Sequence, residues 1–394
     1  MLVSKKEIVN LGVNYFVESM GFASLVAEPQ RLIMIGLAVL LLYLAIAKKV
    51  EPLLLLPLAF GIFLANMPLA GLSASSEDLE GFGLLALMYL GIAHVVFPPL
   101  IFMCIGSMTD FGPLLGNPKT AFIGLGGQLG LFTALFASVW LSRIVPGIDF
   151  DWAEGAAISI IGSADGPTSV WLASQLAPPL LPAIAIAAYS YLALVPLIQP
   201  PIVRLLTTDK ERVIVMPPPK NVTRKQKVIF PVAATFVALL IAPAAGALIG
   251  MMMLGNLIRE SGVVERYVRT LNNDLMNMLT IVIALAIGAS ASAETFLRLE
   301  TILIIVLGLF SFASGTVGGV LIAKLLCYLT GGKINPLIGN SGVSAMPMSA
   351  RVSQKLGQEY NPHNHLLMHA MGPIVASTMG SAIIAGIFTA LFGA

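Results

Sequence analysis

Long apolar runs recur along the chain, and short polar stretches separate them. The longest runs, at 121–141 and 375–394, reach the ~20 residues that a helix needs to cross a bilayer, and those at 32–47 and 180–198 approach it. A transmembrane β-barrel would show short segments of strictly alternating polarity instead. The pattern therefore predicts an all-α polytopic membrane protein.

The apolar stretches predict about eleven transmembrane helices. They cover 31–47, 52–68, 84–107, 120–142, 153–174, 180–203, 229–256, 275–297, 300–327, 335–354 and 366–392. Glycine, proline and polar residues interrupt two of them, at 161–168 and at 335–347. Because these residues disrupt helical hydrogen bonding, we expect two broken helices.

A basic linker at 204–228 divides the chain. It carries seven Lys and Arg residues, and short basic loops face the cytoplasm, so we predict a cytoplasmic linker. The chain then consists of an interfacial N-terminal segment (1–30), a first membrane half (31–203), the linker and a second membrane half (229–394). Strict alternation would place Lys48 and Lys49 outside. Either one broken span re-enters the membrane without crossing it, or that short loop is an exception.

The two broken stretches resemble each other. The string IGSADGPTS (161–169) aligns with IGNSGVSAMP (338–347), and each precedes a long last helix of its half. If one leading helix is followed by five helices in each half, the two halves would be inverted repeats. Inverted repeats with broken helices are typical of transporters whose site lies near the bilayer midplane.

Composition supports the membrane class and excludes other functions. The chain is 57% hydrophobic and 11% charged, against about 25% charged in soluble domains. A net charge of +2 does not suggest nucleic-acid binding. The two cysteines lie in apolar sequence as small hydrophobic residues, and the four histidines do not have the spacing of a zinc site.

Asp165 lies in the first broken stretch. A carboxylate at the centre of a membrane helix costs roughly 2.5–3.5 kcal/mol. Gly162, Gly166 and Pro167 would free backbone carbonyls there, and these can join the carboxylate and the hydroxyls of Ser163 or Thr168 in a site for a small cation. The alternative is an Asp that caps a helix in an interfacial loop.

The second broken stretch carries neutral polar groups, among them Asn335 and Ser344, and one cation, Arg351. Arg351 either binds a carboxylate, holds Asp165 when no ion is bound, or anchors a helix end at the interface. Tyr189 and Tyr191 lie far from flanking charges, so we expect at least one buried phenol that needs a hydrogen-bond partner.

Several long strings have a family resemblance. AKKVEPLLLLPLAFG, MTDFGPLLGNPKT, IIGSADGPT, AAYSYLALVPLIQPP, GNLIRESGVVER, KINPLIGNSGVSAMPMSARV and NHLLMHAMGP resemble the β subunit of sodium-translocating biotin-dependent decarboxylases over nearly the whole chain. Such complexes act on oxaloacetate, methylmalonyl-CoA, glutaconyl-CoA or malonate. The resemblance implies that the β subunit decarboxylates carboxybiotin, consumes a proton and exports Na+.

The resemblance also implies roles for particular residues and partners. Asp165 would be the main Na+ ligand, Asn335 and Ser344 neutral ligands, and Gly339 would permit the break. Tyr191 and Arg351 would serve the proton or the carboxybiotin, which Ser344 would also contact. The implied partners are a biotin carrier subunit, a carboxyltransferase α subunit and a small γ or δ membrane subunit, around an oligomeric β core such as a trimer in the bacterial inner membrane. No covalent cofactor of its own is implied.

Two other classes compete with this interpretation. A secondary Na+/H+ antiporter or organic-anion carrier would show the same broken helices and the same intramembrane Asp. A membrane scaffold has no use for a buried Asp. One departure from the family pattern concerns the last helix, where some members carry Asn and this chain has Ile374.

Overall fold

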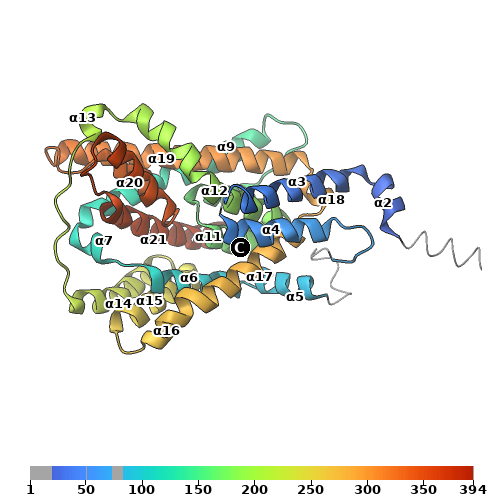
Figure 1. The fold of residues 1–394 in the computed structure, drawn as a ribbon, viewed down its shortest axis with the longest axis horizontal. Helices are drawn as coiled ribbons and strands as arrows, with labels where there is room; N and C mark the ends of the chain where they lie inside the picture. Colours follow the sequence, from blue (N-terminus) through green and yellow to red (C-terminus); the bar gives the residue numbers. More distant parts are fainter. Residues whose placement is uncertain (1–19, 50, 73–82, 394) are drawn as a thin grey trace, which may run out of the picture. The chain divides into compact units, whose positions relative to one another are not determined.

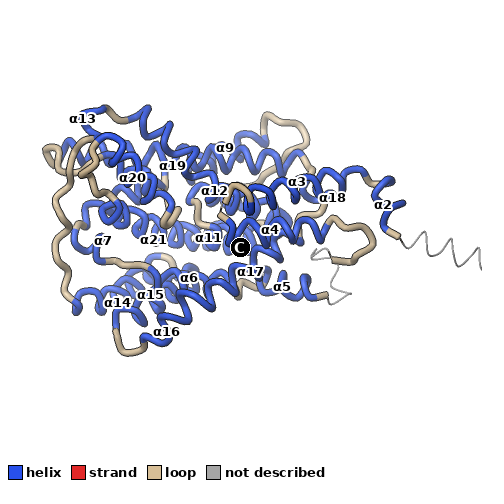
Figure 2. Tube along the Cα trace, viewed as in Figure 1, coloured by secondary structure: helices blue, strands red, loops and turns tan. Residues whose placement is uncertain are grey.

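The computed structural model describes residues 20–49, 51–72 and 83–393 (Figures 1 and 2). Every regular element in these ranges is a helix, which confirms the all-α class. Most of the predicted interfacial segment 1–30 lies outside the described residues. Its described part includes α2 (Gly21–Ala27).

The chain divides into two compact units, residues 1–91 with 280–301 and residues 92–279 with 302–394. The first unit contains α2, α3 (Pro29–Ile46), α4 (Pro52–Ala65), α18 (Ala293–Phe296), most of α5 (Leu84–Ala93) and the larger part of α17 (Met276–Ala289). Within it, α3 packs on α4, and a Cβ at Gly61 would lie 2.3 Å from the Leu285 carbonyl oxygen. Small residues of this kind let membrane helices approach closely.

The second unit contains the remaining helices, except that the first three residues of α19 belong to the first unit. They are α6 (Phe97–Met108), α7 (Gly112–Gly116), α8 (Ala121–Gly127), α9 (Leu129–Ser142), α10 (Trp152–Ser159), α11 (Gly166–Leu176), α12 (Leu181–Leu206), α13 (Asp209–Arg212), α14 (Arg224–Ile241), α15 (Gly246–Ser261), α16 (Glu265–Arg269), α19 (Leu299–Leu329), α20 (Met348–Tyr360) and α21 (Leu367–Phe392). Short tight helices are η1 (Pro118–Thr120), η2 (Ile160–Ser163), η3 (Pro178–Leu180), η4 (Pro243–Ala245) and η6 (Pro336–Gly342), and η5 (Thr270–Leu275) is a π-helix.

Five described helical segments are long and apolar enough to cross a membrane, and seven if each of two bent pairs counts as one span. The five are Pro29–Ile46, Pro118–Ser142, Glu265–Ala289, Leu299–Leu329 and Leu367–Phe392. These segments confirm a polytopic membrane protein. The predicted count of eleven is not confirmed.

The stretch 229–256, predicted as one span, is instead a helical hairpin. Helix α14 ends at Ile241, and Ala242 takes a non-helical conformation (φ −136°, ψ 81°) before Pro243. A residue that precedes proline is disfavoured in the α region, which explains the break. Helix α15 then returns alongside α14, so that Arg224 Nη2 donates a 2.5 Å hydrogen bond to the Ser261 carbonyl (Figure 1).

One apolar cluster of the second unit surrounds both interrupted helices. It includes Ala164 of the first break, Leu337 and Val343 of the second, and Phe312 of α19. The two breaks therefore share a buried environment, and this cluster positions the candidate site.

Candidate functional site

The first break lies between α10 and α11. Helix α10 begins with a capping box, in which the Asp151 carboxylate accepts the Glu154 N–H at 2.7 Å. The helix tightens into η2, Ala164 is left-handed (φ 51°), and Asp165 is extended before α11 begins at Gly166. The helix is thus interrupted within the stretch where the sequence predicts it.

Asp165 itself is buried, with 6% of its surface exposed, so it does not lie in an exposed interfacial loop. Its Oδ2 accepts a 2.6 Å hydrogen bond from Thr168 Oγ1. The Ser381 hydroxyl of α21, which donates to the Thr378 carbonyl of its own helix at 3.0 Å, lies near the carboxylate. No Lys, Arg or His of the described ranges forms an ion pair with it.

The second break lies between α19 and α20. Asn335 Oδ1 accepts the Leu337 N–H at 2.9 Å and so begins η6, which ends at Gly342 before an extended stretch leads to α20. A Cβ at Gly339 would lie 2.5 Å from Val320 Cα of α19, so this position requires glycine for backbone contact. This packing is compatible with the predicted role of Gly339, which is to permit the break in the helix.

The two breaks touch each other. The Ser344 N–H donates a 2.8 Å hydrogen bond to the Ser163 carbonyl. Ser344 Oγ donates to Ser377 Oγ at 3.1 Å and lies 3.4 Å from Ser381 Oγ. Since Ser381 also lies near Asp165, one buried cluster of hydroxyls extends from the carboxylate to the second break.

This cluster combines one negative charge with several neutral oxygens. A buried carboxylate without a cationic partner needs a cation or a proton to balance its charge. Unwound helix segments with hydroxyl and carbonyl oxygens are suited to small hard cations such as Na+. The chemistry of this cluster therefore suits either a small monovalent cation or a proton.

Both tyrosines are buried on α12, but they face different neighbours. The Tyr189 ring packs on the first break, because a Cβ at Gly166 would lie 2.3 Å from Tyr189 Cε1. The Tyr191 hydroxyl donates to the Ile305 carbonyl of α19. Tyr189 is thus the phenol next to Asp165, while Tyr191 ties α12 to α19.

Asn335 holds the linker. Its Nδ2 donates to the carbonyls of Arg212 (3.1 Å) and Ile214 (2.7 Å). The Arg212 side chain is itself buried, with Nη1 2.7 Å from Asp209 Oδ1 and 3.0 Å from the Tyr360 hydroxyl. The amide of Asn335 is therefore engaged with the linker and with η6.

Arg351 is exposed on α20 and forms no ion pair with Asp165 in this conformation. It lines an open pocket of about 460 Å³ together with Gln354, Lys355, Gln358, Glu359 and Leu367. Glu359 pairs with Arg204 at the start of the linker (2.6 Å). The structure thus separates Arg351 from the buried cluster and places it near the linker.

Asp110 belongs to a separate ion pair outside the spans. Its Oδ1 lies 2.8 Å from Lys227 Nζ and accepts the Gly112 N–H at 2.8 Å. Partial burial raises the pKa of the Asp110 carboxyl, but the hydrogen bonds from Lys227 and Gly112 and the charges of Lys227 and Arg259 outweigh burial, so the pKa lies below its ordinary value.

The last helix contributes residues that sequence reasoning missed. Ser377 and Ser381 are four residues apart on α21. In the sequence, this spacing of small polar residues within an apolar run indicates that they share one face of the helix. Ile374 is fully buried in the apolar cluster around the breaks, so that position contributes packing. The polar residues that this helix contributes, Ser377 and Ser381, lie one and two turns beyond Ile374.

The fold and the site define a class: a polytopic α-helical membrane protein in which two interrupted helices meet around a buried carboxylate. Comparison with known proteins narrows this class. The family described as Na+-transporting oxaloacetate decarboxylase beta subunit matches residues 30–392, and the chain belongs to this family.

Similar proteins come from three kinds of decarboxylase. The chain is 51% identical to methylmalonyl-CoA decarboxylase subunit beta of Veillonella parvula, over 98% of this chain and 99% of that protein. It is 52% identical to glutaconyl-CoA decarboxylase subunit beta of Acidaminococcus fermentans (92% and 93%) and 45% identical to oxaloacetate decarboxylase beta chain 2 of Salmonella typhi (95% and 98%).

Proposed function

We propose that the chain is the membrane β subunit of a biotin-dependent decarboxylase complex and couples the decarboxylation of carboxybiotin to Na+ export. The observation that carries the proposal is the buried Asp165 at the contact between two broken helices in a member of this family. Among the residues that the structure describes, it has a hydroxyl partner and no cationic one. A fixed structural carboxylate would be expected to have a permanent counter-charge.

In this proposal Asp165 is the main Na+ ligand. Ser344 supplies a neutral oxygen, and the Ser381 hydroxyl between them supplies another. Gly339 allows η6 to pack closely enough on α19 to bring Ser344 to the first break. Asn335 would coordinate directly only in another conformation, because its amide holds the linker in this one.

Arg351 receives the carboxybiotin from the partner carrier. Its guanidinium lines an open pocket, and arginine binds carboxylates with a planar pair of N–H donors. Ser344 would contact the same substrate deeper in the protein. Decarboxylation breaks the bond between the biotin nitrogen and the carboxylate carbon; CO2 leaves, and the nitrogen takes up one proton. Removal of the carboxylate from water favours this loss.

The proton passes through Tyr191 or onto Asp165. If Na+ and carboxybiotin both stabilise the cytoplasm-open conformation, their binding is coupled through one equilibrium. Proton arrival then displaces Na+ outward. Hydroxyl partners of Asp165 permit this exchange because they can accept from a protonated carboxyl or donate to an ionised one.

The remaining parts of the proposal concern assembly. A biotin carrier subunit, a carboxyltransferase α subunit and a small γ or δ membrane subunit complete the complex, around a β oligomer such as a trimer in the bacterial inner membrane. The carboxyltransferase selects the acyl substrate. Copurification of the partners, followed by assays with oxaloacetate, methylmalonyl-CoA, glutaconyl-CoA and malonate, identifies it.

The test uses the whole complex in sealed vesicles. We expect Na+ uptake that is driven by the decarboxylase substrate and blocked by avidin, and Asp165→Asn should abolish both this uptake and Na+-dependent decarboxylation. Asp151→Asn, which changes an exposed capping Asp, is the matched control and should retain both activities. Substrate-independent Na+/H+ exchange that is insensitive to avidin would favour a secondary antiporter, and full-rate decarboxylation by Asp165→Asn would contradict the proposed coupling.

A further inference from the structure

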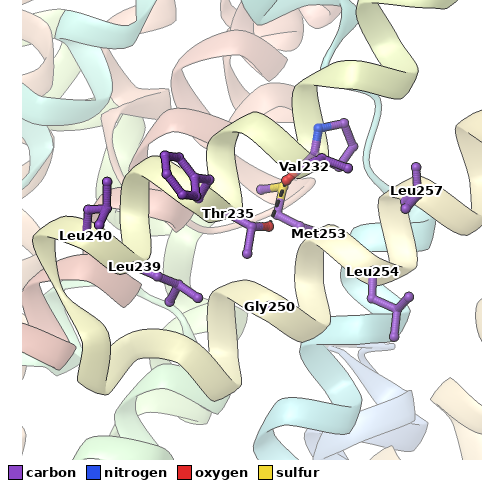
Figure 3. A pocket seen from close by; sticks show the side chains of 10 residues that line it. Val232, Thr235, Leu239, Leu240, Gly250, Met253, Leu254 and Leu257 are labelled. Carbon is purple, nitrogen blue, oxygen red and sulfur yellow. Dashed lines mark hydrogen bonds between the residues drawn. The ribbon is translucent and has the colours of Figure 1, made fainter.

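An apolar groove lies between α14 and α15 (Figure 3), and its lining includes no residue of the buried hydroxyl cluster. It has a volume of about 490 Å³, and its walls include Val232, Leu239 and Leu240 of α14 and Gly250, Leu254 and Leu257 of α15. The hydroxyl of Thr235 is satisfied by the Pro231 carbonyl at 2.7 Å. The groove therefore offers an almost purely hydrophobic wall.

An exposed stripe on α14 forms part of the groove wall and extends past it toward the linker at Ile229. Ile229, Val232, Phe236 and Leu240 follow each other at intervals of three and four residues, and each is 60–70% exposed. From Ile229 to Leu240 the helix rises about 16 Å. This length matches half of the ~30 Å hydrocarbon core, so one acyl chain of a single leaflet fits along the stripe.

A basic pocket of about 570 Å³ lies at the linker end of the same stripe, with Arg224, Lys225, Ile229 and Ser261 in its walls. Arg224 uses one of its five N–H groups on the Ser261 carbonyl, and the others donate to no residue in the described ranges. The Lys225 ammonium forms no hydrogen bond or ion pair within the part of the chain that the structure describes. The positive end of the α14 dipole adds to both charges.

We propose that α14 and α15 form a binding site for one anionic phospholipid. Its phosphate contacts Arg224 and Lys225, and one acyl chain follows the α14 stripe into the groove. Basic pockets between transmembrane helices on the cytoplasmic side bind anionic headgroups, and the linker end of α14 is the end that we predict to be cytoplasmic. The inference is independent of the proposed Na+ site, because the two share no residue.

The test measures lipid binding to the purified full-length protein in detergent by native mass spectrometry. The probes are phosphatidylglycerol, phosphatidylcholine with the same acyl chains, and glycerol phosphate, which has the anionic group without a chain. Two variants address the two parts of the site. Arg224→Gln with Lys225→Gln removes the charges, and Gly250→Leu fills the groove, where a Cβ meets nothing within 4 Å.

Matched controls separate the site from general lipid contact. Lys48→Gln with Lys49→Gln removes an exposed basic pair elsewhere, and Gly36→Leu enlarges another helical glycine whose Cβ would also meet nothing within 4 Å. We expect preferential binding of phosphatidylglycerol, weakened roughly 30-fold by the double charge variant at about fivefold per cation. Gly250→Leu should also weaken it, and neither control should.

Three results would overturn the inference. Equal binding of both phospholipids would remove the anionic preference. Equal losses in Gly250→Leu and Gly36→Leu would show that the groove is not the chain site. Glycerol phosphate that competes as well as the intact lipid would show a free-phosphate site instead.

Discussion

At the residue scale, the partners of Asp165 determine what the site can exchange. Thr168 and Ser381 offer hydroxyls, and hydroxyls can donate to an ionised carboxylate or accept from a protonated one. A Lys or Arg partner would supply a permanent counter-charge, and a cation would then gain little by binding next to Asp165. The neutral shell therefore leaves the charge of Asp165 to be balanced by a mobile Na+ or a proton.

Replacement of Ser381 tests this shell. We expect Ser381→Ala to weaken the apparent Na+ affinity about fivefold, because it removes one neutral oxygen worth about 1 kcal/mol. The measurement is the Na+ concentration dependence of decarboxylation. Ser174→Ala is the matched control, since the Ser174 hydroxyl donates to the Trp171 carbonyl of its own helix. An unchanged Na+ dependence in Ser381→Ala would show that this serine is not part of the proposed Na+ site.

The Asp110–Lys227 pair predicts a pH dependence of stability. Because the folded-state pKa of Asp110 is lowered, the pair stabilises the fold above the unfolded pKa and loses this contribution as the pH falls through the folded pKa. Asp110→Asn should therefore lower the melting temperature at neutral pH, and the difference from the unmodified protein should shrink in acid. Thermal unfolding in detergent across this range measures it. A constant difference at all pH values would contradict the ion-pair explanation.

At the element scale, glycines bring the backbones of three elements into contact around the second break. A Cβ at Gly127 of α8 would lie 1.7 Å from the Gly342 carbonyl oxygen, and one at Gly319 of α19 would lie 2.2 Å from that of Gly339. Helix η6 is therefore held between α8 and α19. Any larger residue moves the whole segment, and Ser344 moves with it.

Gly127→Ala should consequently destabilise the protein by about 1–3 kcal/mol or more, as overpacking does in a filled interior. Gly250→Ala, which faces open space, should be neutral or stabilising by up to about 1 kcal/mol because alanine favours the helix. The two variants are compared by the fraction of each that remains monodisperse after heating. Equal survival would show that α8 and η6 can separate without cost.

The sequence could predict the breaks but not all of their contacts. Glycine and proline around Asp165 and Gly339 mark interrupted helices because their backbone effects are local. Ser381 comes near Asp165 although the two are more than 200 positions apart, and Ser377 and Ser381 look like ordinary small residues of an apolar helix. The hairpin at 229–256 was missed because hydropathy does not register the reversal before Pro243.

At the scale of the whole molecule, the linker is docked onto the second unit. Arg212 is buried, contacts Asp209 and Tyr360, and donates to the carbonyls of Arg204 and Thr207. Asn335 and Asn364 donate to the Arg212 carbonyl from the other side, at 3.1 and 3.2 Å. The linker thus contacts the residue that begins η6, and η6 leads to Ser344.

This connection predicts that the linker influences Na+ binding at a distance. Arg212→Gln leaves the carbonyls of Arg204 and Thr207 without their donors, a loss of about 1.5–3 kcal/mol for bonds to a charged group. We expect faster cleavage of the linker by proteinase K. Because the main-chain carbonyl of residue 212, to which Asn335 donates, is then held less rigidly, we also expect a weaker apparent Na+ affinity in decarboxylation. Lys210→Gln, an exposed linker change, should alter neither. Faster cleavage with an unchanged Na+ dependence would mean that the linker is docked there without coupling to the site, and the second break would then have to be positioned by α8 and α19 alone.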